Sequence, residues 1–306
     1  MQGYIFKRLI QAVLTLILAS IIVFLLARMT GDPAALLLAE YSTAEDKAIL
    51  TQQLGLDKPV PEQYAVFVWN ALHGDLGKSI RGERAPALGL VAERLPASLQ
   101  LAAVALLVSL LLGLPLGVFS AVGKGSWYDA LFRILALLGQ SAPVFWIGIV
   151  AMYLLSVQLH WLPTSGYGRP EQFVLPALAM SSFQVAAILR LTRSSMLDSL
   201  GSEYIKLARI KGLSERIVVW KHALRNSLLP VLTYSGTILG RMITGVVVVE
   251  TVFAWPGIGR LAYESVMSRD FPVLQAVVLL MAALFLGINL VVDVLYAYVD
   301  PRIHYS

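Results

Sequence analysis

The chain lacks cysteine and is poor in charged residues. No cysteine occurs among its 306 residues, which excludes disulfides, thiolate metal sites and cysteine nucleophiles. The histidines are few and scattered, with no metal-ligand spacing among His73, His160, His222 and His304. Only 14% of the residues are charged and 58% are hydrophobic, whereas soluble domains carry about 25% charged residues. The composition therefore excludes a soluble protein and indicates a membrane protein, with no metal or other cofactor predicted.

Long apolar runs predict membrane-spanning helices. A spanning helix needs about 20 mostly apolar residues. Six stretches with at most one charged residue approach that length, and they are 9–27, 95–123, 134–168, 172–189, 226–249 and 271–292. Trp161, Pro163 and Gly166 interrupt the third stretch, which predicts one helix from about Leu131 to Val157. The predicted fold is an all-α polytopic membrane protein with six transmembrane helices.

The basic residues indicate how the chain crosses the membrane. If the N-terminus is cytoplasmic, 13 of the 24 Lys and Arg residues lie in the cytoplasmic segments 1–8, 123–133, 190–226 and the C-terminal tail. Cytoplasmic loops collect Lys and Arg, so we expect both termini in the cytosol. The net charge of +5 has the same explanation, and no nucleic-acid partner is predicted.

The segment 28–94 is predicted to form short helices outside the membrane. One helix is expected to start after Thr43 and to stop at Gly55. Another is expected to start at Pro61 and to direct three aromatic residues toward an apolar surface, Tyr64, Phe67 and Trp69. Such helices can be a packing cover over the bundle or a ligand site, and the sequence leaves both open.

The segment from Glu203 to Pro230 is predicted to form two helices joined by a turn. Gly212 suits a left-handed helix end, and Ser214 can cap the second helix. Apolar residues recur at helical spacing on both sides of this turn, as Tyr204, Leu207 and Ala208 and then as Ile217, Trp220 and Leu224. A protruding unit of this kind suits insertion into a partner's groove. The alternatives are a basic loop that follows the positive-inside rule and a segment lying on anionic lipid.

This segment resembles the EAA loop of ABC importer permeases through Glu203, Ala208, Gly212, Leu229 and Pro230. In closer detail it is similar to the membrane subunits of dipeptide, oligopeptide, glutathione and nickel importers. Seven further motifs match that family in order: Gly31-Asp32-Pro33, Leu54-Gly55-Leu56-Asp57, His73-Gly74-Asp75, Trp161-Leu162-Pro163, Arg193-Ser194-Ser195-Met196, Trp255-Pro256-Gly257-Ile258-Gly259 and Asp300-Pro301-Arg302. The resemblance covers essentially the whole chain. One departure is Tyr204, which stands at the second position of the short motif.

The resemblance implies a transport subunit of the bacterial inner membrane with the type I ABC importer fold. Residues 1–93 would hold the first span and the extracytoplasmic helices, and 94–300 the importer domain with a coupling loop at 196–227. The implied partners are a homologous second permease, two ATPase subunits, an extracytoplasmic solute-binding protein and the lipid membrane. The residues expected to couple this chain to an ATPase are Glu203, Tyr204, Lys206, Ala208, Arg209, Lys211, Gly212, Leu213, Ser214 and Ile217.

The chain itself is not predicted to hydrolyse ATP or to carry catalytic residues. Its nearest approach to a phosphate-binding loop ends in Gly123-Lys124-Gly125, but five residues separate Gly117 from Gly123 and no Ser or Thr follows the lysine. This stretch is interpreted as a helix end at the cytoplasmic surface.

Two charged residues within the apolar stretches are candidates for function. Arg241 can line a water-filled pathway and attract a substrate carboxylate, or it can pair structurally with an acid such as Glu250 or with helix-end carbonyls. Asp293 is expected to pair with Arg190 or Arg193. Two small-residue patterns permit close helix approach, Gly113 to Gly117 and Gly236 to Gly240, and packing within the chain is the default interpretation of both. The second is the better candidate for an interface with the second permease, because it lies beside Arg241.

The predicted cargo is peptide, with nickel or another metal chelate as the alternative. An ion-driven secondary transporter would need a titrating mid-membrane acid, whereas the only mid-span charge is Arg241. A membrane scaffold would not need Gly212 and a two-helix loop. An ATP-driven importer permease is therefore the preferred hypothesis.

Overall fold

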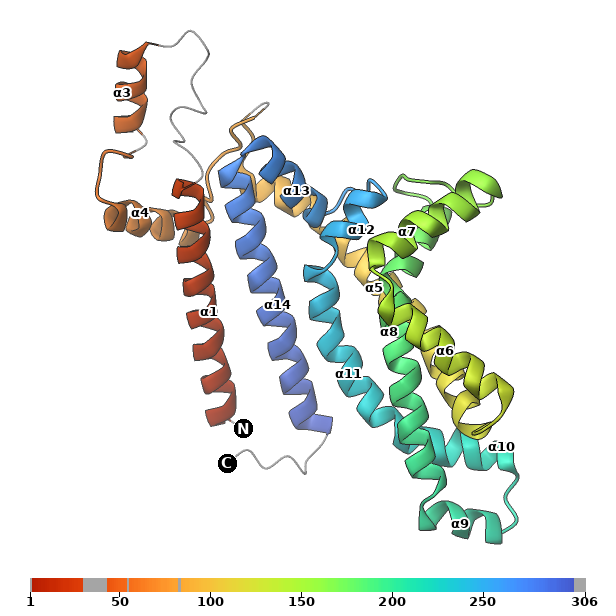
Figure 1. Ribbon diagram of the computed structural model, residues 1–306. Helices are drawn as coiled ribbons and strands as arrows, with labels where there is room; N and C mark the ends of the chain where they lie inside the picture. The colour runs from red at the N-terminus through yellow and green to blue at the C-terminus, as the bar shows by residue number, and fades with distance from the viewer. Residues whose placement is uncertain (1, 30–42, 54, 82–83, 300–306) are drawn as a thin grey trace. The chain divides into compact units, whose positions relative to one another are not determined.

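The computed structural model describes residues 2–29, 43–53, 55–81 and 84–299 (Figure 1). In these residues every regular element is helical, and the one strand-like contact is an isolated bridge between Lys78 and Pro86. The all-α prediction is confirmed. The predicted motifs Gly31-Asp32-Pro33 and Asp300-Pro301-Arg302 lie outside the described residues, as does Leu54.

The chain folds into two compact units, Met1–Pro96 with Gly257–Ser306, and Ala97–Pro256. The helices of the first unit are α1 (Gln2–Met29), α3 (Ala44–Gln53), α4 (Val60–Leu72), α13 (Ile258–Ser268) and α14 (Phe271–Val299). The second unit contains most of α5 (Ala87–Val122), followed by α6 (Trp127–Ser141), α7 (Val144–Met152), η1 (Tyr153–Gln158), α8 (Pro170–Leu200), α9 (Glu203–Ile210), α10 (Glu215–Ile217), η2 (Val218–Ala223), α11 (Leu224–Thr244) and α12 (Val247–Val252). The predicted domains, 1–93 and 94–300, stay a prediction.

Four helices are long and apolar enough to cross a membrane, α1, α5, α8 and α14, and α6 with α7 and η1 makes a fifth crossing if the bent pair is one span. The chain is therefore a multi-pass membrane protein. The predicted helix from Leu131 to Val157 is wrong, because α6 and α7 meet at a bend of 106°. Pro143 explains the bend, since proline cannot donate a backbone hydrogen bond and pushes Ala142 into an extended conformation (φ −84°, ψ 135°). The predicted fifth span is present as the helix α11, which is not among the four, so the count of six spans is not confirmed.

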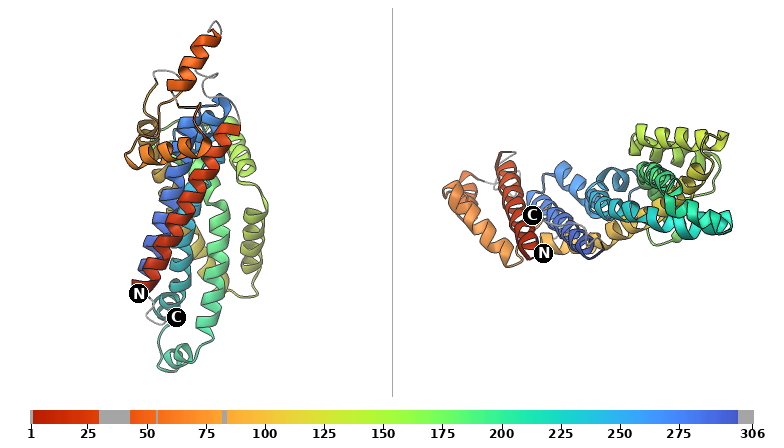
Figure 2. Two further views of the ribbon diagram at one scale, coloured as in Figure 1. Left: turned by 90° about the vertical axis from the view of Figure 1, so that its left-hand side faces the viewer. Right: turned by 90° about the horizontal axis from the view of Figure 1, so that it is seen from below.

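In the first unit, α1 and α14 lie side by side and antiparallel (Figures 1 and 2). Arg8 Nε lies 3.1 Å from Asp293 Oδ2, which places the beginning of α1 beside the last turns of α14. The predicted pairing of Asp293 with Arg190 or Arg193 is therefore wrong. The sequence could not reveal this partner because the choice depends on which helices are neighbours.

The two short helices predicted in 28–94 are observed as α3 and α4. Tyr64 and Phe67 of α4 pack on Phe24 of α1, with ring centroids 5.4 and 5.5 Å apart. Trp69 is exposed, so its predicted place on the apolar surface is wrong. Within the first unit, α4 thus covers the end of α1 through two of the three predicted aromatic residues.

In the second unit, α6, α7 and α11 all pack on α8, and α5 approaches α8 through two glycines. A Cβ atom at Gly117 would lie 2.5 Å from the Thr192 side chain, and one at Gly113 would lie 2.7 Å from Ile188. Such distances leave no room for a side chain, so the predicted role of the Gly113 to Gly117 pattern in packing within the chain is confirmed.

Candidate functional site

The helix α9 forms where the sequence predicts the first half of the loop. Ser202 occupies the N-cap position, Glu203 lies in the first turn and Arg209 in the last, which suits the helix dipole at both ends. Lys206 Nζ also pairs with Glu203 Oε1 at 2.7 Å, one turn away on the exposed surface. Local sequence therefore specifies this short helix.

Gly212 ends α9 in a left-handed conformation, as predicted. Its φ is +78°, a region that glycine enters without steric cost. The backbone N–H of Leu213 donates to the Ala208 carbonyl at 3.3 Å, and that of Gly212 donates to the Arg209 carbonyl at 2.9 Å. These two bonds form a Schellman motif, which satisfies the last carbonyls of the helix.

One side of α9 is anchored in the protein. Ile205 and Ala208 are buried in an apolar cluster with residues from three other elements, Val118 and Ala121 of α5, Met196 of α8, and Val218, Val219 and Ala223 of η2. Full burial of an aliphatic side chain contributes about 1.5–3 kcal/mol. The helix α9 is thus held against the ends of α5 and α8.

Another face of α9 is apolar and exposed. The exposed fractions are 40% for Tyr204, 52% for Leu207 and 82% for Ile210. These three residues are spaced three positions apart, close to one helical turn, and so form one stripe along the helix. We call Tyr204, Leu207 and Ile210 the exposed stripe; Leu213 and Ile217 are also exposed beyond the turn.

The second predicted helix differs from its expected form. It begins after Ser214, whose backbone carbonyl accepts from the N–H groups of Ile217 and Val218 while its side chain makes no capping bond. After the three residues of α10 the chain continues as the π-helix η2 and then as α11. Ile217 and Trp220 are exposed, and Leu224 packs partly against the buried cluster, so the single predicted face is divided.

An ion pair closes the loop across the turn. Arg209 Nε lies 2.7 Å from Glu215 Oε1, and Nη2 lies 3.2 Å from Oε2. These two hydrogen bonds hold the pKa of the Glu215 carboxyl below its ordinary value. Lys211 supplies the C-cap position of α9.

The start of α11 is also bonded to α8. Ser227 is buried, and its Oγ donates to the Ser195 carbonyl at 3.0 Å and lies 2.9 Å from Ser199 Oγ. The loop therefore enters from α8 and leaves through α11 with both ends fixed to the same helix.

Arg241 lies on α11 with an exposed side chain. Glu250, which the sequence suggested as an ion-pair partner, is fully buried and accepts a hydrogen bond from Ser98 Oγ at 2.5 Å. The pathway role of Arg241 stays a prediction. Among the residues described, no group of three or more His, Asp or Glu is placed to hold a metal ion.

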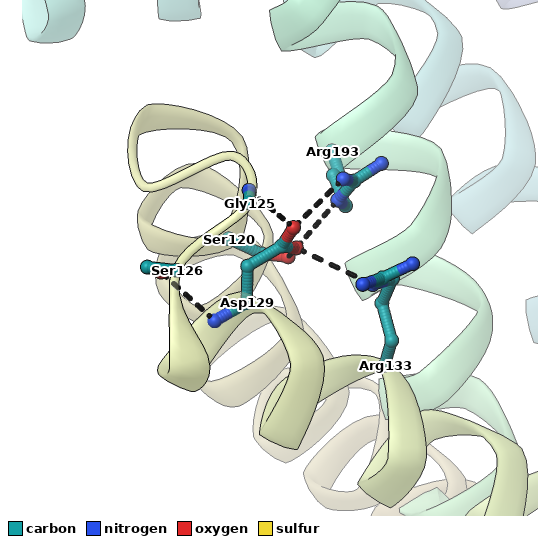
Figure 3. A network of polar contacts seen from close by, with 6 residues as sticks. All are labelled: Ser120, Gly125, Ser126, Asp129, Arg133 and Arg193. Atoms are coloured by element: carbon teal, nitrogen blue, oxygen red, sulfur yellow. Dashed lines mark hydrogen bonds and ion pairs between the residues drawn. The ribbon is translucent and has the colours of Figure 1, made fainter.

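Sequence reasoning missed a polar cluster around Asp129 at the start of α6 (Figure 3). Asp129 is buried, and its carboxylate contacts Arg193 of α8 at 2.8 Å. Ser126, the N-cap of α6, accepts from the Asp129 N–H at 3.2 Å. A serine followed three residues later by an acid is a helix-start signal, and it could have shown that Asp129 belongs to a helix rather than to a loop.

Two family profiles together cover nearly the whole chain. Residues 113–305 match the family described as "binding-protein-dependent transport system inner membrane component", and residues 1–102 match its N-terminal counterpart. The chain is similar to a putative peptide transport system permease of Brucella suis, with 40% identity over 315 residues and 100% of both chains covered. It is also similar to a glutathione transport system permease of Escherichia coli O6:H1, with 41% identity over 307 residues and 100% of both chains covered.

Solved ABC transporters share the fold. The inward-facing MetNI methionine ABC transporter matches 69% of this chain and 96% of the solved chain, with a TM-score of 0.58 and 20% identity. An amino acid ABC transporter solved with histidines matches 70% of this chain and 94% of the solved chain, with a TM-score of 0.51 and 17% identity. The family profiles and the full-length relatives show that this chain belongs to the inner-membrane permease components of binding-protein-dependent ABC importers, which work with ATPase subunits and a solute-binding protein.

Proposed function

We propose that this permease imports peptides across the inner membrane together with a homologous second permease, and that α9 is the helix through which an ATPase subunit drives it. The observation that carries the proposal is the two-sided character of α9. Ile205 and Ala208 anchor one side in the buried cluster, while the exposed stripe leaves the other side free to enter an apolar groove.

The exposed stripe has the chemistry of a docking surface. Burial of two large apolar side chains in a groove would contribute roughly 3–6 kcal/mol before the cost of association. Lys206 and Lys211 flank the stripe and can guide docking onto an acidic rim. The Schellman turn at Gly212 fixes where α9 ends and so holds the stripe in one orientation.

The substitution Leu207→Asp tests the docking role. A carboxylate in an apolar groove is strongly unfavourable, so we expect the ATPase subunits to be lost when the complex is purified through the permease. Leu72→Asp on α4 is the matched control, because Leu72 is 78% exposed and belongs to the other unit. Full retention of the ATPase by Leu207→Asp would remove the docking role.

We propose that both termini and α9 lie in the cytosol. The distribution of Lys and Arg supports this orientation, and the antiparallel pairing of α1 and α14 supports placing both ends of the chain on one side. The absence of cysteine makes the test direct. Single cysteines at Ser214 and at Leu72 should react with an impermeant thiol reagent only from the inner and the outer side, respectively; the reverse pattern would overturn the orientation.

The proposed cargo follows from the full-length relatives, whose names specify peptide and glutathione transport. The measurement is uptake into proteoliposomes that contain the permease pair, the ATPases and the cognate solute-binding protein. Uptake of a short peptide is expected. Uptake of a nickel chelate without uptake of peptide would replace this cargo with the alternative from the sequence.

Arg241 is proposed to face the pathway and to attract a cargo carboxylate. Arg241→Ala should then reduce uptake while the complex still assembles. Arg241→Lys keeps the charge but loses the bidentate guanidinium, so intermediate uptake is expected. Normal uptake by Arg241→Ala would exclude the pathway role.

A further inference from the structure

The buried carboxylate of Asp129 joins the α5–α6 turn to α8. Arg193 Nε donates to Oδ1 at 2.8 Å and Nη2 donates to Oδ2 at 3.0 Å. Ser120 Oγ donates at 2.6 Å, and the Gly125 N–H donates at 3.1 Å (Figure 3). Because the arginine contact is bidentate, it fixes the angle between the start of α6 and α8 as well as their distance. We call these four residues the Asp129 staple.

The ion pair between Asp129 and Arg193 is largely shielded from solvent. The Asp129 side chain is 1% exposed and that of Arg193 is 21% exposed. A carboxylate enclosed in this way is stable only where its donors remain in place, since an uncompensated buried charge is costly. Arg133 does not belong to the staple, because its Nε lies 3.7 Å from Asp129 Oδ1 and its side chain is 54% exposed.

The staple lies next to the buried cluster that holds α9. Arg193 and Met196 are one turn apart on α8, and Met196 belongs to the cluster that buries Ile205 and Ala208. Val118 and Ala121 bring the last turn of α5 into the same cluster, and Ser120 of that turn belongs to the staple. Apolar contacts are non-directional and permit sliding, whereas the ionic contact has one geometry.

We propose that Asp129 is a positioning residue for energy coupling, which makes the α5–α6 turn, the end of α8 and α9 move as one body. This rests on the proposed docking of α9. When an ATPase displaces α9, α8 moves with it through the buried cluster, and the staple carries the α5–α6 turn along. Without the staple, α8 and α9 move while the turn lags, and ATP is hydrolysed without a matching transport step.

The test is the ratio of cargo uptake to ATP hydrolysis in one proteoliposome sample. The sample contains the permease pair, the ATPases and the solute-binding protein. Asp129→Asn keeps the shape of the side chain but removes the charge that holds Arg193. We expect uptake per ATP to fall about fivefold or more, the scale of a typical coupling between sites, while ATPase association is retained.

Two controls separate coupling from loss of any ion pair. Glu264→Gln removes the pair between Arg260 and Glu264 on α13, whose atoms lie 2.7 Å apart in the first unit. Arg133→Gln removes only the peripheral contact of Asp129. Both variants should keep the wild-type ratio, and a fall in Glu264→Gln equal to that in Asp129→Asn would contradict a specific role for the staple.

The remaining outcomes decide the proposal. An unchanged ratio in assembled Asp129→Asn overturns it, even if the complex melts at a lower temperature, because the staple would then be structural only. If Asp129→Asn does not assemble, Arg193→Lys decides, since lysine keeps the charge but not the fork; an unchanged ratio there also overturns the proposal. Leu207→Asp has a different expected result, because it loses the ATPase subunits. The proposal for docking and the proposal for the staple are therefore tested by different measurements.

Discussion

Two carboxylates in this permease each join two helices through an arginine, in different surroundings. Asp129 is enclosed between α6, α5 and α8, and two further donors besides arginine hold it. Asp293 contacts Arg8 at 3.1 Å between α14 and α1, with 20% and 45% of the two side chains exposed. The residue types are the same, but the Asp129 carboxylate is fully buried whereas that of Asp293 is partly exposed. Removing one partner of a buried pair costs several kcal/mol, and the contribution of a pair falls toward about 0–1 kcal/mol as its exposure rises.

The glycines of the same two regions differ in the same way. A Cβ at Gly117 of α5 would lie 2.5 Å from the Thr192 side chain and 2.8 Å from the Leu189 carbonyl of α8, whereas a Cβ at Gly287 of α14 would meet nothing within 4 Å. The second unit is thus specified by close fits around α8. The α1–α14 pair tolerates more variation because its surface is open.

The largest expected effect is the loss of stability in Asp129→Leu. The substitution leaves the half-buried guanidinium of Arg193 without its counter-charge, and breaking such a pair costs up to about 3–5 kcal/mol. Asp293→Leu should cost about 1 kcal/mol or less. Thermal unfolding of the purified complex in detergent checks both, and equal losses would remove the distinction between the two pairs.

The double variant Asp129→Leu with Arg193→Met sharpens this comparison. Replacing both members of a buried ion pair by apolar residues is often neutral for stability. We therefore expect the double variant to regain most of the melting temperature lost in Asp129→Leu. A loss equal to the sum of the single losses would show that the pair is not the source of the effect.

The next effect is steric. Gly117→Val places a side chain within 2.5 Å of Thr192, and overpacking of this kind typically costs about 1–3 kcal/mol. Gly287→Val on α14 has open space and should change stability by less than about 1 kcal/mol. The measurements are the yield and the melting temperature of the two variants. A larger loss in Gly287→Val than in Gly117→Val would contradict the difference between the two regions.

A smaller effect is expected at Gly212, where the constraint is conformational. Gly212→Val has space around its Cβ but must adopt φ +78°, which costs about 1–2 kcal/mol. Gly201→Ala is the control in the same loop, because the φ of Gly201 is −82° and its nearest contact would be 3.5 Å. Uptake should fall in the first variant only. Normal uptake by Gly212→Val would show that the turn does not set the position of α9.

Much of the structure of the loop that contains α9 could be predicted from the sequence, because its determinants are local. Glycine favours the left-handed conformation that ends a helix, so Gly212 alone predicts the end of α9. The spacing of Tyr204 and Leu207 likewise depends only on positions close together in the sequence. The partners of Asp129, Asp293 and Arg193 could not be predicted, since they depend on which distant helices become neighbours. The bend of 106° at Pro143 could be predicted only in part. Proline predicts a break in the helix, but the angle of the bend depends on packing against α8.

The smallest expected effect concerns pH and the pair between Arg209 and Glu215. Because the pKa of Glu215 is lowered in the folded loop, its stabilisation is complete above the ordinary glutamate pKa and is lost as pH falls through the lowered pKa. Both side chains are largely exposed, so the effect is small. Amide exchange of α9, corrected for intrinsic pH dependence, should differ between wild type and Glu215→Gln at neutral pH and converge in acid. A difference that grows in acid would contradict this assignment.

The most direct test of the central claim is protection of the exposed stripe by an ATPase subunit. A single cysteine at Ile210, which is 82% exposed in the isolated chain, is labelled with a thiol reagent in the permease alone and in the assembled complex. The account predicts rapid labelling in the permease and strong protection in the complex, with Leu72→Cys labelled equally in both. Equal labelling of Ile210→Cys with and without the ATPases would contradict docking through α9.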